Sequence, residues 1–132
     1  MNVETIREYC LSLPLATEDF PFDEETLAFR VLGRIFAMID LNDASWFVLK
    51  CDPDYALVLR DAHVEIKGAW HMNKRHWNQV NLFGHLSNAL IQSMIRHSYT
   101  EVVRKLPNKL KRDNPIVTSI CEHAPKDLLA KE

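Results

Sequence analysis

Glycine and cysteine are scarce in this sequence, and each scarcity excludes a class of site. Three glycines in 132 residues leave no glycine-rich loop of the kind that cradles nucleotide phosphates, so nucleotide-dependent catalysis is disfavoured. The three cysteines, Cys10, Cys51 and Cys121, are widely spaced and form no C-x-x-C pair. The sequence therefore indicates neither a disulfide framework nor a thiolate zinc site, and we expect buried, reduced thiols.

Long apolar runs are also missing, which excludes a membrane-spanning helix. The N-terminus has acidic residues where a signal peptide would need a cationic start and an apolar stretch, so a cytoplasmic location is predicted. With 47% hydrophobic and 26% charged residues, the chain suits one monomeric globular domain, which we place at residues 1–112. Prolines interrupt the pattern beyond it, so residues 113–132 are expected to form a loosely ordered tail with at most a short helix at 127–131.

Charge is distributed unevenly along the chain, although the formal net charge is only -2. Residues 1–62 contain 5 Lys/Arg and 12 Asp/Glu, whereas residues 63–112 contain 9 Lys/Arg and 2 Asp/Glu. A basic segment can approach a polyanion that an acidic segment repels, so binding of this kind would be oriented and salt-sensitive. The alternative is that the two segments mainly attract each other.

Three helices are predicted from their capping residues and from the spacing of apolar side chains. Asn2 is a suitable N-cap for a helix over 3–13, and Asp52, followed by a proline, begins a second helix. Ser87 begins the longest helix, whose apolar residues recur every three to four positions as far as Leu106.

Alternation of apolar and polar residues predicts strands between these helices. A turn at Gly33 joins the first two strands into an antiparallel hairpin. Strands are expected, in chain order, at 26–32, 35–39, 46–51, 64–67 and 76–83. The acidic segment 16–25 is predicted to be an ordered loop. These elements together indicate an α+β fold with an antiparallel β-sheet.

The most unusual stretch runs from Trp70 to Trp77. It contains two indoles, two imidazoles, two permanent cations and an amide, and burial would leave most of these groups unpaired. We therefore interpret it as a surface for a partner. Lys74 and Arg75 can hold phosphates, Asn73 can contact base edges, and either tryptophan can stack on an unpaired base. The alternative is that the tryptophans close the core, the histidines bond to loop carbonyls and the cations are only solvated.

Patterns that would indicate a metal site or a catalytic site are missing. His71 and His76 are five residues apart, and no H-E-x-x-H, H-x-x-x-H or cysteine pair accompanies them. Neighbouring His–Ser and Cys–Glu–His sequences occur near positions 97 and 122, but adjacent residues do not present their side chains to each other as a triad requires. We predict a protein without a cofactor that is not an enzyme. The third hypothesis, an enzyme, would need a pocket that gathers His71, His76 and an acid from the N-terminal half.

Five short motifs occur in order along the chain: Tyr9-Cys10-Leu11-Ser12-Leu13-Pro14, Glu18-Asp19-Phe20-Pro21-Phe22, Leu49-Lys50-Cys51-Asp52-Pro53, His71-Met72-Asn73-Lys74-Arg75-His76-Trp77 and Ser98-Tyr99. They resemble the MmcQ/YjbR family over about residues 6–110, although Trp70 stands where the family usually has a tyrosine. The resemblance implies a frataxin-like (CyaY-like) fold, in which the first and last helices cover one face of the sheet, and it implies the family's description as DNA-binding. It does not imply iron binding, because the first helix lacks a long acidic ridge.

The predicted site combines the motif with the end of the last helix. The resemblance supplies Tyr99 and Lys105, and the basic helix end supplies Arg104. The full set is Trp70, His71, Asn73, Lys74, Arg75, His76, Trp77, Tyr99, Arg104 and Lys105. We predict a small cytoplasmic protein that binds nucleic acid, with DNA as the expected ligand, through non-specific phosphate contacts. The alternative is a protein-interaction or chaperone-like adaptor whose Trp, Met and His side chains bind a peptide or a subunit.

Overall fold

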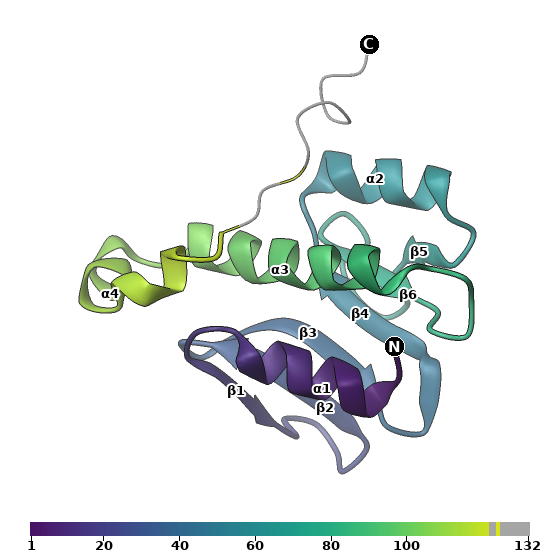
Figure 1. The fold of residues 1–132 in the computed structure, drawn as a ribbon, viewed down its shortest axis with the longest axis horizontal. Helices are drawn as coiled ribbons and strands as arrows, with labels where there is room; N and C mark the ends of the chain where they lie inside the picture. Colours follow the sequence, from purple (N-terminus) through teal and green to yellow (C-terminus); the bar gives the residue numbers. More distant parts are fainter. Residues whose placement is uncertain (122–123, 125–132) are drawn as a thin grey trace.

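A six-stranded antiparallel sheet with helices on one face forms the fold (Figure 1). The computed structural model describes residues 1–121 and 124. The strands are β1 (Ala16–Asp19), β2 (Thr26–Val31), β3 (Arg34–Asp40), β4 (Asp43–Lys50), β5 (Ile66–Gly68) and β6 (Trp77–Val80). The helices are α1 (Val3–Ser12), α2 (Pro53–Ala62), α3 (Asn88–Arg104), α4 (Asn108–Asp113) and a 3-10 helix, η1 (Pro115–Thr118). The strand order is β1-β2-β3-β4-β6-β5, so the predicted α+β class is confirmed.

The predicted capping residues begin the three main helices. The Asn2 side chain accepts a hydrogen bond from the Thr5 amide (2.8 Å), and the Asn2 amide donates to the Thr5 hydroxyl (2.9 Å), which completes a capping box. Asp52 accepts from two amides in the first turn of α2, and Ser87 accepts from the Leu90 amide at 3.1 Å. These local bonds explain why the helix starts were readable from the sequence.

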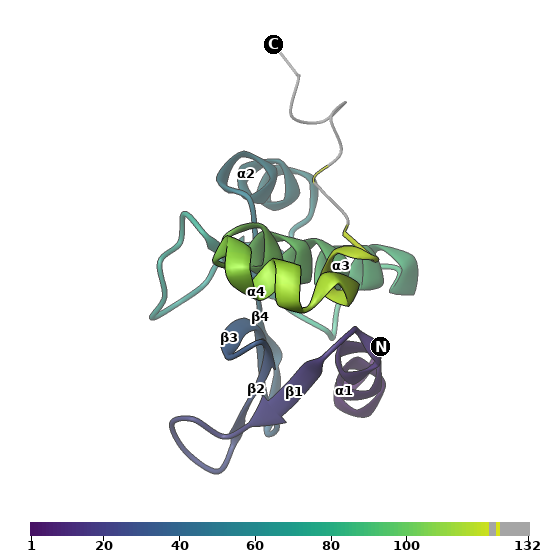
Figure 2. The same ribbon diagram turned by 90° about the vertical axis from the view of Figure 1, so that its left-hand side faces the viewer.

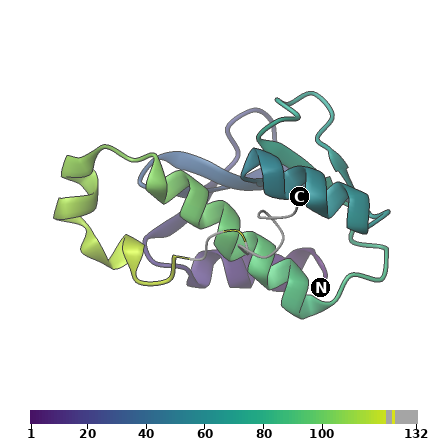
Figure 3. The ribbon, with the colours of Figure 1, turned by 90° about the horizontal axis from the view of Figure 1, so that it is seen from above.

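The main core lies between the sheet and α1 and α3. Helix α3 crosses the sheet with α1 on one side and α2 on the other (Figures 1 and 3). Phe29, Phe36 and Phe47 project from the sheet into this core and are fully buried. The ring of Tyr99 in α3 meets Phe36 edge-on with 5.5 Å between centroids, and its hydroxyl donates to the Pro14 carbonyl at 2.5 Å.

The opposite face of the sheet, called here the open face, carries a second and smaller apolar cluster. Ala28, Met38 and Val48 lie on neighbouring strands and are at most 3% exposed. Met72 and Trp77 pack against them, together with other half-buried residues. No described helix is part of this cluster, and the loop that follows β5 projects away from the strands on the side opposite α1 (Figure 2).

The segment predicted to be an acidic loop is partly a strand, so that prediction was wrong. Ala16 to Asp19 form β1, which pairs with β2 at the edge of the sheet. Arg7 forms an ion pair with Glu18, and Arg30 forms one with Asp19 at 2.9 Å. The loop prediction was based on the acidic composition of this segment. The two arginines neutralise its carboxylates and so allow it to pair as a strand.

Part of the predicted tail belongs to the folded domain. Val117 in η1 lies beyond the predicted boundary at residue 112, yet it is fully buried against the main core. Cys10 and Cys51 are buried as expected, but Cys121 is exposed. The helix expected at 127–131 lies outside the described residues. Within the described part of the chain, no helix has the length and apolar character needed to cross a membrane.

Candidate functional site

The predicted motif forms the loop between β5 and β6, on the open face. The Ala69 amide donates to the Trp77 carbonyl (3.1 Å), and the His76 amide donates to the Asn73 carbonyl (3.1 Å), so the loop is held at both ends. At its tip, the side-chain oxygen of Asn73 accepts from the Arg75 amide at 2.9 Å. This turn occupies the acceptor that the sequence analysis had assigned to base edges.

Arg60 in α2 fastens this loop to the rest of the domain. Its guanidinium donates to the Asn78 side-chain oxygen (2.7 Å), to the Trp77 carbonyl (3.3 Å) and to the Lys74 carbonyl. This role of Arg60 was not predicted from the sequence, because an arginine in an amphipathic helix is usually a solvated charge. In the strand predicted at 76–83, Asn78 occupies an inward-facing position. A buried Asn side chain needs a hydrogen-bond partner, and this is the sequence signal that points to a residue such as Arg60.

Four basic side chains gather where this loop meets the end of β4 and the C-terminal end of α3. We call Lys50, Arg75, His76 and Lys105 the basic surface. The Cys51 amide donates to the His76 carbonyl at 2.8 Å, which places His76 beside Lys50. Burial lowers the pKa of His76, the charges of Lys105, Lys50 and Arg75 lower it further, and the Glu101 carboxylate opposes this shift. Arg75 and His76 of the motif thus lie on the same side of the domain as Lys105 at the end of the last helix and Lys50 at the end of β4.

Lys50 and Trp77 are opposite one another on β4 and β6. The Lys50 ammonium lies 5.2 Å from the centroid of the indole, in the geometry of a cation–π contact. Partial burial lowers the pKa of Lys50, and the neighbouring Lys105 lowers it further. The Lys50 ammonium lies over the Trp77 ring, and the ring packs on the open-face cluster. Trp77 therefore has a structural role, and its ring is not available to stack on a base.

Two residues predicted from the last helix, Tyr99 and Arg104, are not available for binding at the basic surface. Tyr99 is fully buried in the main core, so its assignment to a binding surface was wrong. The Arg104 guanidinium donates to the buried Glu101 carboxylate at 3.0 and 3.4 Å, and this pairing raises the pKa of Arg104. Its charge is therefore largely balanced, whereas that of the exposed Lys105 is not opposed in this way.

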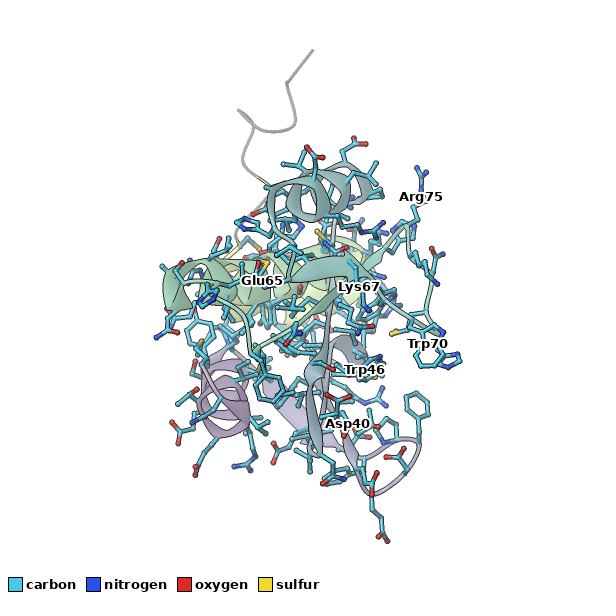
Figure 4. The ribbon with its side chains drawn as sticks, turned by 90° about the vertical axis from the view of Figure 1, so that its right-hand side faces the viewer. Asp40, Trp46, Glu65, Lys67, Trp70 and Arg75 are labelled. Atoms are coloured by element: carbon cyan, nitrogen blue, oxygen red, sulfur yellow. The ribbon has the colours of Figure 1, made fainter. Side chains whose placement is uncertain are left out.

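Trp70 and His71 lie on another part of the loop. Trp70 is 64% exposed, and the His71 ring stacks on it with 4.1 Å between centroids. His71 has a φ of 67°, a left-handed conformation that is uncommon outside glycine. The Trp70 amide donates to the Gln79 side chain at 3.2 Å, and the two rings border an open groove together with Asp40 and Asp43. The motif therefore has a cationic part and an aromatic part with acidic neighbours (Figure 4).

Lys74 takes part in neither grouping through the contacts seen here. Its aliphatic stem packs over Gly68, where an added Cβ would lie 3.0 Å from the Lys74 Cγ. Gly68 therefore permits the close approach of the loop to β5. The ammonium group of this exposed residue extends from that stem.

His97 and Ser98, considered above as a possible catalytic pair, have structural contacts. The His97 Nε2 accepts from the Asp52 amide at 3.1 Å, and its ring meets Tyr55 edge-on. The Ser98 hydroxyl lies 2.5 Å from the Lys50 carbonyl and 2.9 Å from the Met94 carbonyl. Both side chains thus fix the end of β4. Among the described residues, no three His, Cys, Asp or Glu side chains form a group suited to a metal ion.

Comparison with known proteins identifies relatives that span most of the chain. The family model YjbR matches residues 11–101, a range that contains the whole motif but ends before Arg104 and Lys105. The uncharacterised protein YjbR of Escherichia coli (strain K12) is 28% identical over 113 residues, which cover 85% of this chain and 96% of that protein. The uncharacterised protein YbdF of Escherichia coli O157:H7 is 33% identical over 107 residues, covering 80% and 88%.

Solved structures with the same fold are also found. The crystal structure of the Deinococcus radiodurans protein DR2400, a DUF419 domain, matches with a TM-score of 0.80 and 35% identity, covering 86% of this chain and 88% of that one. A Pseudomonas syringae protein matches with a TM-score of 0.62 and 27% identity, covering 74% and 96%. These names assign no activity, so a function has to be argued from this chain's own surface.

Proposed function

The chain belongs to the YjbR family, and we propose that it is a small nucleic-acid-binding protein whose ligand is DNA, held by the basic surface. The observation that carries the proposal is that three cations from separate segments of the chain, Arg75, Lys50 and Lys105, lie within electrostatic range of His76, whose carbonyl accepts from the Cys51 amide next to Lys50. The nearby Glu101 carboxylate is paired with Arg104, so a bound phosphate would offset the repulsion among the remaining cations.

The chemistry of these side chains favours phosphates over bases. Arg75 offers a guanidinium fork that matches phosphate oxygens, and Lys50 and Lys105 offer point charges. Asn73 uses its side-chain oxygen within the loop, and Lys50 covers the Trp77 ring. Contacts that read sequence are therefore few, and binding should be non-specific and dominated by charge.

The distribution of charge supports one orientation of the bound nucleic acid. Asp40 and Asp43 border the groove beside Trp70, and the acidic turn at 23–25 lies next to it, since the Leu41 amide donates to the Glu25 carbonyl at 2.9 Å. These carboxylates would repel a polyanion. We place the nucleic acid on the Arg75 and Lys105 side of the loop and not over Trp70.

Fluorescence anisotropy of labelled duplex and single-stranded DNA at low salt tests this proposal. Wild-type protein should bind, and Arg75→Ala should weaken binding about eightfold at 0.1 M salt, the loss expected for one phosphate contact. Arg34→Ala removes an equally exposed arginine from the distant β2–β3 turn and is the matched control. Equal losses in both variants would place the binding elsewhere, and no binding even at low salt would remove the proposal.

The alternative proposal is a protein-interaction adaptor that uses the Trp, Met and His side chains of the motif. Two of its expected anchors, Met72 and Trp77, pack on the open-face cluster, and only Trp70 remains largely exposed. An adaptor would retain its partner at high salt, so a protein that copurifies at 1 M salt and is lost in Trp70→Ala would favour it. The cytoplasmic location and the monomeric state remain predictions, which cell fractionation and size-exclusion chromatography would test.

A further inference from the structure

We propose that the groove on the open face binds an organic ammonium cation, at a site separate from the basic surface. The groove has a volume of about 410 Å³, which is within the usual size of small-molecule sites. Its walls include two indoles, Trp46 and Trp70, and two carboxylates, Asp40 and Asp43. Aromatic faces beside carboxylates are a combination that attracts cations.

The residues of the groove come from separate parts of the sheet and meet on one side of it. Asp40 is the last residue of β3, Trp46 belongs to β4, and Trp70 extends from the loop after β5. Figure 4 shows these three side chains on the same side of the sheet, with Trp46 between Lys67 and Asp40 and with Trp70 projecting outward. A ligand in the groove would therefore contact aromatic and acidic groups together.

The charge of the groove is negative. Its described lining contains Asp40 and Asp43 and no lysine or arginine. The Ser45 hydroxyl and amide both donate to Asp43 (2.6 and 3.0 Å) and lower the pKa of its carboxyl, so Asp43 is ionised at neutral pH. Lys67 lies on β5 opposite Gln79 and is outside the lining.

The walls are held in place before any ligand arrives. Gln79 is only 8% exposed, and it accepts from the Trp70 amide (3.2 Å) and donates to the Ser45 carbonyl (3.3 Å). One side chain thus ties the Trp70 wall to β4. Trp46 packs against the open-face cluster, and His71 stacks on Trp70. Walls whose backbone is tied in this way need less reordering when a ligand binds, which favours recognition of a small group.

The combination of indole rings and carboxylates in the groove favours one class of cation. A metal ion prefers several oxygen or nitrogen ligands with little apolar surface, and no described group of His, Cys, Asp and Glu meets that need. A quaternary or alkyl ammonium group has apolar substituents that fit against indole rings while its charge faces carboxylates. Such a group occurs in free small molecules such as choline and in methylated lysine side chains.

NMR titration with choline chloride tests the site in the intact protein. The three indole N–H signals belong to Trp46, Trp70 and Trp77. The proposal predicts saturable shifts for Trp46 and Trp70 and none for Trp77, whose ring lies under Lys50. The neutral isostere 3,3-dimethylbutan-1-ol should bind at least tenfold more weakly. Equal binding of the isostere, or equal shifts of all three indoles, would overturn the proposal.

Two carboxylate variants provide the matched comparison. Asp40→Asn with Asp43→Asn removes both charges but keeps the side-chain oxygens that accept turn hydrogen bonds from Asn42 and Ser45. This variant should lose at least tenfold in choline affinity, whereas Glu8→Gln with Asp61→Asn, on exposed positions of α1 and α2, should lose none. Unchanged choline affinity in the first variant would contradict a cation site.

A third arm identifies the source of the cation. A short neutral peptide that contains trimethyllysine should bind at least tenfold more tightly than choline if the natural ligand is a protein side chain, and no more tightly if it is a free small molecule. Binding in either range supports the site, and failure of both probes to bind removes it. Arg75→Ala should leave choline affinity unchanged, so the site and the proposed nucleic-acid function can fail independently.

Discussion

His76 reports directly on the charges around it. Its pKa is lowered first by burial and then by Lys105, Lys50 and Arg75. Because the folded protein holds this proton more weakly than the unfolded chain does, the associated stability is present above about pH 6.5, the ordinary histidine value, and is lost as the pH falls through the folded pKa. We predict an NMR titration of His76 below pH 6.5.

Substitution of the neighbouring cation should move this titration. Lys105→Gln should raise the pKa of His76, whereas Lys109→Gln in α4 should leave it unchanged. DNA bound to the basic surface should also raise it, since phosphates offset the same repulsion. If the pKa of His76 is at or above 6.5 and does not change in Lys105→Gln, the charges of the basic surface do not act on His76, and this account is wrong.

Single residues were predictable from the sequence where their role depends on exposure and charge. Arg75 was found in this way, whereas Lys105 was assigned through the family resemblance; both charges act on His76. Tyr99 was assigned through its place in the family motif, and its buried hydroxyl bond to Pro14 could not be seen without the fold. Arg60 and Gln79 were missed, because their partners are backbone groups distant in the sequence.

Among the elements, α2 controls the motif loop through Arg60. Arg60→Ala removes the donor from Asn78, whose side chain is 2% exposed, so it should lower the free energy of unfolding by about 1–3 kcal/mol. Urea denaturation measures this loss, and hydrogen exchange should show faster exchange of the His76 amide. Arg34→Ala, at an exposed turn, should change stability by less than about 0.5 kcal/mol. Equal effects of the two variants would contradict the role assigned to Arg60.

The turn between β2 and β3 allows a second test at this scale. Gly33 has a φ of +85°, and nothing lies within 4 Å of a Cβ added there. Gly33→Ala should therefore cost about 1–2 kcal/mol through backbone strain alone. Thermal unfolding would measure it, and an unchanged melting temperature would show that the turn adopts another conformation.

Elements were predictable where their signals are local. Capping residues and helical spacing gave the three main helices close to their observed bounds. Strand β1 was missed because its stability comes from pairing with β2 and from ion pairs with Arg7 and Arg30, and neither is visible in a short segment. The second apolar cluster was missed for the same reason, since its buried residues come from β2, β3, β4 and the start of the loop after β5.

At the scale of the whole molecule, the uneven charge along the sequence becomes an arrangement in space. Cations from β4, the motif loop and α3 meet at the basic surface, while carboxylates from β3 and β4 border the groove beside Trp70. The asymmetry was visible in the sequence, but the division of the motif between these two regions was not, because it depends on how the loop turns at Asn73.

The measurement that most directly tests the account is the salt dependence of DNA binding by wild-type protein and by Arg75→Ala with Lys105→Ala. The three Lys and Arg side chains of the basic surface predict a slope of log affinity against log salt near -3, which is about a 40-fold loss of affinity between 50 and 200 mM salt. The double variant should reduce the magnitude of the slope by about 2. A wild-type slope near zero, or an equal slope in the double variant, would contradict phosphate binding at this surface.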